Sequence, residues 1–117
     1  MKTTFLTSAV VPAARGSVKV NKDRNNNYLI KIKVLHLAET KRLTPPRNMY
    51  VVWLMTDKNT PQNLGMIKSS STFWSKILRA SFEGVSSNKP ARIFITAEDD
   101  AKIHSPGSQV VLSTAAL

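Results

Sequence analysis

The residues best suited to chemistry are two small groups of histidine and acidic side chains. His36 precedes Glu39 by three residues, and His104 follows the acidic residues 98–100. A metal site needs three or more converging ligands, with carboxylates favouring calcium or magnesium and imidazoles favouring zinc or copper. Neither spacing matches an established metal-binding loop, and acidic residues at a strand end ahead of Pro106-Gly107 are typical of a solvated turn. We therefore predict no metal and no cofactor.

Hydrolytic and thiol chemistry are equally poorly supported. A serine hydrolase needs a nucleophile served by a histidine base and a fixed acidic partner. The chain has many serines and two histidines, His36 and His104, but it has no nucleophile-elbow motif. The absence of cysteine excludes disulfides, Cys-ligated zinc, blue copper and thiol catalysis. Met49, Met55 and Met66 offer sulfur ligands, but methionine in apolar runs usually fills a core. We predict that the protein is not an enzyme.

Positive charge is the strongest chemical signal in the sequence. Seventeen Lys and Arg stand against seven Asp and Glu, which gives a formal net charge of +10. Such a surface favours anionic partners, namely nucleic acid, lipid headgroups or acidic glycans. The alternative is that the charge only keeps the protein soluble. The candidate polyanion-binding residues lie on one predicted hairpin and are Lys19, Lys22, Arg24, Lys31 and Lys33.

A β-hairpin is predicted to position these cations. Residues 17–21 and 28–37 alternate between apolar and polar side chains, and the asparagine-rich residues 23–27 between them favour a turn. Counting inward from this loop pairs residues that share one side of the sheet. The predicted pairs are Lys22 with Tyr28, Val20 with Ile30 and Val18 with Ile32 on the core side, and Lys19 with Lys31 outside.

A second segment, residues 49–55, is predicted to be the central strand. Its seven successive residues are apolar or aromatic, too few to span a membrane and suited to a strand covered on both faces. Pro45 and Pro46 exclude a helix just before it, and residues 57–61 supply turn chemistry after it. Trp53 is predicted to be buried, with a hydrogen-bond acceptor for its indole N–H.

The remaining segments are short and read mostly as strands. Residues 73–83 fit either a helical stripe or a strand, and we favour the strand because the neighbouring segments are strands and no helix cap is evident. Phe73 and Trp74 could stack on sugars or bases, although burial in the core is the more usual role. Residues 38–47 are long enough to cross between sheets, and residues 84–90 are predicted to form a loop. Further strands are predicted at residues 9–11, 62–68 (with a bulge near Gly65), 92–98 and 110–112.

These segments predict an all-β fold. About seven strands, recurring roughly every ten to fifteen residues, indicate an antiparallel immunoglobulin-like β-sandwich, with an open Greek-key barrel as the alternative. At 117 residues and 13.0 kDa the chain suits one domain. We place this domain at residues 17–117, preceded by an N-terminal extension, residues 1–16, with a possible short strand.

A family resemblance rests on five short motifs. These are Tyr50-Val51-Val52-Trp53-Leu54, Asn63-Leu64-Gly65, Phe94-Ile95-Thr96-Ala97-Glu98, Pro106-Gly107 and Val110-Val111-Leu112. With them, the chain from about residue 18 to 112 resembles the extracytoplasmic C-terminal domain of bacterial anti-sigma-K-type factors. In that family the domain follows a transmembrane helix and a sigma-binding segment, which this sequence does not contain. The resemblance therefore implies a sandwich outside the cytoplasmic membrane, periplasmic or secreted, and implies no sigma-factor binding.

Two functional hypotheses follow. The first is a non-catalytic extracytoplasmic module for binding, sensing or adapting, and the second is a protein that binds nucleic acid or acidic polysaccharide through its lysines. The partner is accordingly a protein or an anion, and no integral membrane segment is predicted. Residues 1–6 resemble the start of a signal peptide, but Thr7, Ser8 and Pro12 interrupt the apolar run. We therefore predict no leader in this chain.

Overall fold

The computed structural model describes residues 1–71 and 78–117. Within them, secondary structure consists of strands and one short 3-10 helix, η1 (Thr40–Arg42). Every strand pairing is antiparallel. The nine strands are β1 (Lys2–Thr4), β2 (Arg15–Lys22), β3 (Tyr28–Leu35), β4 (Met49–Met55), β5 (Pro61–Met66), β6 (Lys68–Ser71), β7 (Leu78–Ser86), β8 (Arg92–Glu98) and β9 (Val110–Ser113).

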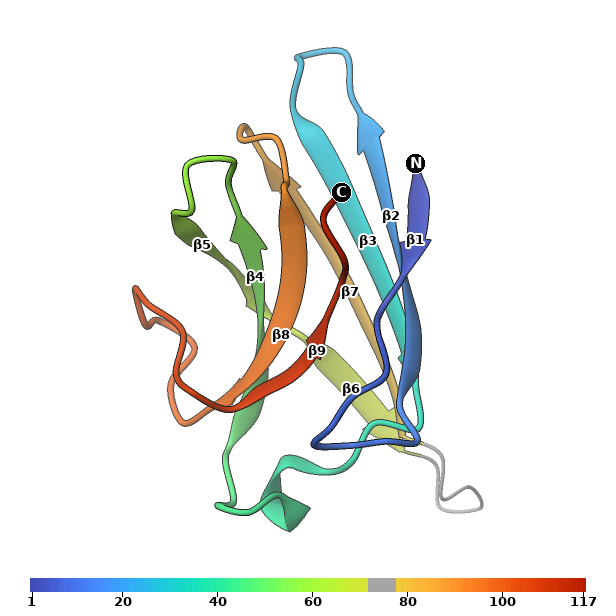
Figure 1. The fold of residues 1–117 in the computed structure, drawn as a ribbon, viewed down its shortest axis with the longest axis vertical. Coiled ribbons are helices and arrows are strands. Elements are labelled where there is room, and N and C mark those ends of the chain that lie inside the picture. The colour runs from blue at the N-terminus through green and yellow to red at the C-terminus, as the bar shows by residue number, and fades with distance from the viewer. Residues whose placement is uncertain (72–77) are drawn as a thin grey trace.

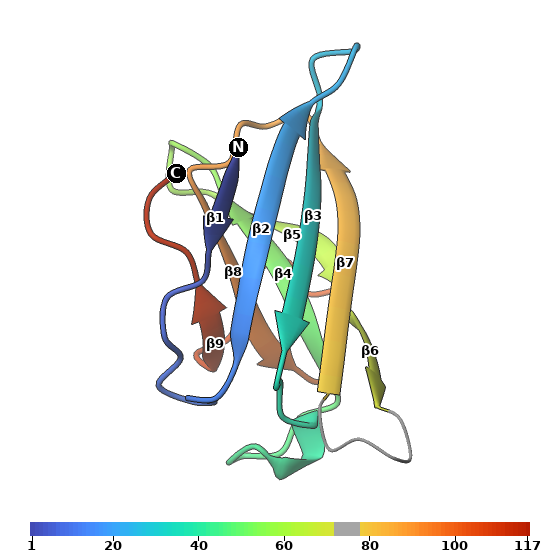
Figure 2. The same cartoon turned by 90° about the vertical axis from the view of Figure 1, so that its right-hand side faces the viewer.

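The strands form two sheets that pack face to face (Figure 1). One sheet has five strands in the order β1-β2-β3-β7-β6, and the other has four in the order β5-β4-β8-β9. Figure 2 shows the outer face of the five-stranded sheet. The predicted all-β sandwich is confirmed, with nine strands in the described residues where about seven were expected. The narrower immunoglobulin-like topology stays a prediction.

The core between the sheets follows the period of two in the strands. Alternate aliphatic side chains of β2 and β3 point inward and meet those of β4 and β8. The most deeply buried of them are at most 1% exposed. They are Val18, Ile30, Ile32, Val34, Val52, Leu54, Ile93 and Ile95.

The register predicted for the hairpin is confirmed. In β2 and β3, Lys22 pairs with Tyr28, Val20 with Ile30, Val18 with Ile32, and Lys19 with Lys31. The loop between the strands is held by the Asp23 carboxylate, whose Oδ1 accepts hydrogen bonds from the backbone N–H of Asn25 at 2.8 Å and Asn27 at 2.9 Å. Asn26 has a positive φ of 63°. Asp and Asn thus perform the turn chemistry expected of them.

Strand β4 is central, as predicted, and lies between β5 and β8. Tyr50, Val52 and Leu54 face the core between the sheets, whereas Val51 and Trp53 face the opposite side. Both faces are covered, and Trp53 is fully buried. Its indole N–H donates a hydrogen bond to the Thr96 hydroxyl at 2.8 Å, which confirms the predicted acceptor.

The outer cover of β4 is a loop, residues 99–109, and not a second sheet. Its Ile103 packs against a small apolar cluster formed by Val51, Trp53 and Phe94, with Met49 and Met55 at the cluster's margin. The Trp53 and Phe94 rings stack, with centroids 6.3 Å apart and planes 12° from parallel. Met49 and Met55 are therefore packing residues, as predicted, whereas Met66 is 50% exposed.

The N-terminal segment differs from the prediction. Residues 9–11 form no strand but a bend, in which the Ser8 hydroxyl accepts hydrogen bonds from the N–H groups of Val10 and Val11 at 3.2 and 2.9 Å. The strand in this region is β1, which pairs with β2. Phe5 and Val11 are buried in the core. Of the two valines before Pro12, Val11 is thus buried without strand pairing, whereas Val10 is exposed.

The segment predicted as one strand at residues 62–68 is split. Strand β5 pairs with β4, whereas β6 pairs with β7, so the chain passes from one sheet to the other at the buried Ile67. The predicted bulge is confirmed: Gly65, with φ of 127°, lies opposite Val52, and Asn63 lies opposite Trp53. The extra residue between them bends the strand toward the other sheet.

Strand β7 confirms the strand interpretation for residues 78–83. Phe73 and Trp74, the other part of that prediction, lie outside the described residues. The loop predicted at residues 84–90 begins only after Ser86, because Gly84 and Val85 still pair with β3. Residues 38–47 do cross between the sheets, as predicted, and contain η1.

Candidate polyanion-binding face

Lysines of three neighbouring strands stand in register on the outer face of the five-stranded sheet. Lys2 of β1 pairs with Lys19 of β2, and Lys19 pairs with Lys31 of β3. All three are exposed. Paired strands lie about 4.8 Å apart, so each lysine has another as its nearest cross-strand neighbour. We call Lys2, Lys19 and Lys31 the lysine row; Figure 2 shows the strands that carry it.

Two further cations extend the row into a basic face. Lys33 lies two residues beyond Lys31 on the same side of β3, with the neutral Ser17 and Ser81 as its cross-strand partners. Arg79 lies on the outer side of β7 and is exposed, since its neighbour Ala80 faces the core opposite Val34. The basic face is the lysine row together with Lys33 and Arg79.

Little negative charge offsets these cations. Among the described residues, Glu83 is the one acidic residue on this side of the sheet, where it pairs with Lys31 at the end of the row. The ion pairs found in the described part of the chain are Arg42 with Glu39 at 3.9 Å and Arg47 with Asp99 at 3.0 Å. Neither involves the basic face.

The five cations predicted from the sequence divide into two groups. Lys19, Lys31 and Lys33 lie together on the basic face. Lys22 lies on the core side of β2, where its Nζ is 5.9 Å from the centroid of the Tyr28 ring. Arg24 is exposed in the hairpin loop. The last two therefore lie at the end of the hairpin and do not extend the row.

Sequence reasoning missed Lys2 and Arg79. Lys2 is the first residue of a strand of three residues, which is too short for a recognisable alternation. Arg79 does lie in an alternating run, in which Arg79, Ser81 and Glu83 occupy one side. That signal placed it on a solvent face, but nothing local identified β3 as the neighbouring strand.

The basic face offers no stacking platform. The neutral residues on the same side of β2, β3 and β7 are polar or aliphatic, and none of those described is aromatic. They include Ser17, Asn21, Leu29, Leu35 and Val85. Proteins that bind single strands through their bases stack them on aromatic rings. This face is therefore suited to reading charge, not bases.

The two histidine and acid groups do not form sites. Glu39 forms its ion pair with Arg42 at 3.9 Å. Glu98 accepts hydrogen bonds from the Thr96 hydroxyl at 2.6 Å and the Gly107 N–H at 2.8 Å, while His104 is exposed. The described residues contain no group of three or more His, Asp or Glu able to hold a metal ion.

Tyr50, on the core side of β4, is buried and only 3% exposed. Burial raises the pKa of Tyr50 to about 12, because the charged phenolate is poorly solvated there. Its hydroxyl donates to the backbone oxygen of Ala38. This contact fixes the crossing between the sheets and is structural.

None of the helices in the described part of the chain has the length and hydropathy that a membrane crossing requires. No protein-family model, curated protein or solved structure matches this chain.

Proposed function

We propose that the protein is a non-catalytic module that binds a polyanion through the basic face. The observation that carries this proposal is the lysine row, in which three lysines face one another across strands. Like charges directly opposite on a sheet are destabilising, by a few tenths of a kcal/mol to about 1 kcal/mol per pair. A bound anion would be attracted by all three lysines and would offset their mutual repulsion. Solubility alone does not require lysines to stand directly opposite one another, so the row favours an anionic ligand.

The ligand class follows from the geometry of the face. Cations about 4.8 Å apart across strands, and roughly 6.8 Å apart along β3 from Lys31 to Lys33, suit a chain with closely repeated negative charges. Acidic polysaccharides and nucleic-acid backbones both meet this requirement. Without aromatic side chains on the described part of the face, recognition depends on charge and is independent of base sequence.

The location of the protein is a second part of the proposal. The resemblance to anti-sigma-K-type C-terminal domains supports a position outside the cytoplasmic membrane, where a binding module serves as a sensor or adaptor. Protease treatment of spheroplasts that express the tagged protein, together with assay of the tag in the medium and in the periplasmic fraction, tests the location. Tag that is released or is digested without lysis supports it, and tag that is retained and fully protected contradicts it.

A salt titration tests the binding. Fluorescence anisotropy should detect binding of a labelled heparin fragment or a random-sequence DNA duplex at 50 mM salt, with neutral dextran as the control ligand. If four phosphates are neutralised, the logarithm of the DNA association constant falls against log salt with a slope of about −3.6, roughly a 100-fold loss between 50 and 200 mM. Binding that is indifferent to salt, or equal for dextran, contradicts the proposal.

A further inference from the structure

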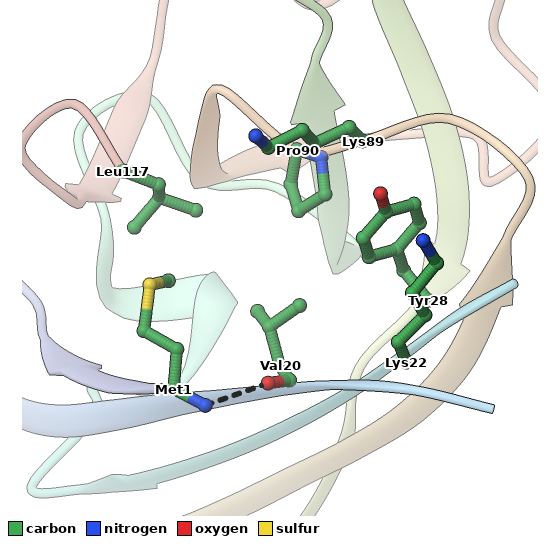
Figure 3. A pocket seen from close by; sticks show the side chains of 7 residues that line it. All are labelled: Met1, Val20, Lys22, Tyr28, Lys89, Pro90 and Leu117. Carbon is green, nitrogen blue, oxygen red and sulfur yellow. Dashed lines mark hydrogen bonds between the residues drawn. The ribbon is translucent and has the colours of Figure 1, made fainter. Parts of the chain in front are cut away.

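At one end of the sandwich, a cavity lies between the five-stranded sheet and the segments that carry Lys89, Pro90 and Leu117, at the loop end of the β2–β3 hairpin (Figure 3). Its origin lies in the register of that hairpin. The inward-facing pairs run from Val18–Ile32 to Val20–Ile30, both aliphatic, and then to Lys22–Tyr28. The last pair continues the core side without filling it, and a space of about 220 Å³ remains.

The opposite walls of the cavity are apolar and are held by backbone hydrogen bonds. Leu117 is anchored by its N–H, which donates to the Ala91 oxygen at 2.8 Å. Met1 is anchored to Val20, whose N–H donates to the Met1 oxygen at 2.8 Å and whose oxygen accepts from the Met1 amine at 2.9 Å. Pro90, which is buried, lies at the top of the cavity in Figure 3.

The polar side chains that line the cavity are cationic or neutral. Lys22 and Lys89 contribute two exposed amines, and Tyr28 contributes a hydroxyl beside Lys22. Among the described residues, no acidic side chain lines the space. Neither lysine takes part in an ion pair with any described residue, the carboxylate of Leu117 included. An apolar chamber with unpaired cations at its mouth is complementary to a molecule with an apolar body and an anionic head.

We propose that this cavity binds a small apolar carboxylate, with its hydrocarbon body between Val20, Pro90 and Leu117 and its carboxylate between Lys22 and Lys89. The volume limits the size of the ligand. It corresponds to about seven water molecules at roughly 30 Å³ each. This is below the roughly 300–1,000 Å³ of sites for drug-sized ligands, so a short-chain or single-ring acid fits and a long-chain fatty acid does not.

The proposal is separate from polyanion binding, because the cavity lies at the end of the sandwich and shares no residue with the basic face. The two sites can therefore be disabled one at a time. The variant with Lys19, Lys31 and Lys33 changed to Glu should bind a small carboxylate as the parent does.

The experiment is an NMR titration of the whole chain with hexanoate at constant ionic strength, followed through the methyl groups of Val20 and Leu117. Saturable shifts with a Kd of about 1 mM are expected. Hexanamide, which has the same shape without the charge, should bind at least about tenfold more weakly, because hydrogen bonds to a charged group are the stronger ones. Equal affinity for the amide, or no saturation by about 50 mM hexanoate, overturns the proposal.

A matched pair of variants tests the assignment of the cations. Changing Lys22 and Lys89 to Gln should weaken hexanoate binding about tenfold while the spectrum of the folded protein is retained. Changing Lys58 and Lys102 to Gln, two exposed lysines in other loops, should leave the affinity unchanged. Equal loss in both variants, or no loss in the first, shows that the cavity does not use its lysines and contradicts the proposal.

Discussion

The indole Nε1 of Trp53 donates a 2.8 Å hydrogen bond to the hydroxyl of Thr96 on the neighbouring strand. Thr96 is itself fully buried, and its hydroxyl donates a hydrogen bond to the Glu98 carboxylate at 2.6 Å. Glu98 also accepts from the Gly107 N–H at 2.8 Å. The chain of contacts links the central strand to the loop that covers it, and no buried side-chain nitrogen or oxygen of the described residues lacks a hydrogen-bond partner.

Thr96→Val should destabilise the protein through this chain. The substitution keeps the shape of the side chain but leaves the buried indole N–H of Trp53 without an acceptor, which costs about 1–3 kcal/mol. Urea unfolding measures the change, with Thr96→Ser, which keeps the hydroxyl, as the control. A valine variant as stable as the serine variant contradicts the role assigned to the hydroxyl.

Asn63→Asp should loosen the covering loop. The Asn63 Nδ2 donates to the backbone oxygens of Ala101 and Ile103 at 2.8 and 2.9 Å, and its Oδ1 accepts from the Gly65 N–H at 2.8 Å. Aspartate keeps the acceptor but repels the two oxygens. Hydrogen exchange in residues 99–109 should therefore accelerate.

Trp53 emission gives a second measure of the same variant. With Trp74 replaced by Phe, the emission should shift to the red as water reaches the indole. Unchanged exchange and unchanged emission in Asn63→Asp would mean that the loop is held by its apolar contacts alone.

Tyr50 makes stability depend on pH in the alkaline range. Its pKa is 10.0 for a free side chain and is raised to about 12 by burial, so the folded state favours the neutral phenol. The resulting stabilisation is complete below pH 10 and is lost as the pH rises through 12. Relative to Tyr50→Phe, the parent should lose on the order of 2–3 kcal/mol over that range.

The Tyr50→Phe variant also tests the hydrogen bond of the Tyr50 hydroxyl at neutral pH. Phenylalanine cannot donate to the Ala38 oxygen, so Tyr50→Phe should be less stable than the parent by about 1 kcal/mol at pH 7. Chemical unfolding at a series of pH values gives both results. A difference between the two proteins that does not change with pH contradicts the burial of an ionisable hydroxyl at this position.

Lys19→Glu should stabilise the protein while it weakens polyanion binding. The glutamate would lie between Lys2 and Lys31 and replace two repulsive pairs with two attractive ones. The gain should be a few tenths of a kcal/mol to about 1 kcal/mol at low salt and should disappear near 1 M salt. Thermal unfolding measures it, with Lys58→Glu as the control. A destabilised Lys19→Glu would mean that the row carries no repulsion.

Much of the fold was predictable because its signals are local. The alternation of β2 and β3 and the Asp and Asn residues between them fixed a hairpin register that the structure confirms residue by residue. The uninterrupted apolar run of β4 likewise predicted two covered faces. Where one face must be buried, a shift by one residue would expose the entire apolar set, so a local pattern is sufficient.

The remainder depends on contacts between distant segments. Nothing near residue 53 indicates that a loop some fifty residues later covers the outer face of the sheet, or that Asn63 holds this loop. Strand β1 is too short for an alternation, so Lys2 could not be placed beside Lys19. The cavity also depends on the packing of Leu117 against a different loop. Short polar segments carry little periodicity, and tertiary contacts decide their position.

The most direct test of the central claim compares two triple variants on a heparin column at low salt. One carries Lys19, Lys31 and Lys33 changed to Glu, and the other carries the exposed loop or 3-10 helix residues Lys41, Lys58 and Lys102 changed to Glu. Both variants have the same net charge, so they differ only in which three lysines are reversed in charge. We expect the control to be retained and the basic-face variant to pass through, with both melting near the parent's temperature. Equal retention of the two variants would contradict the account and assign the positive charge to solubility.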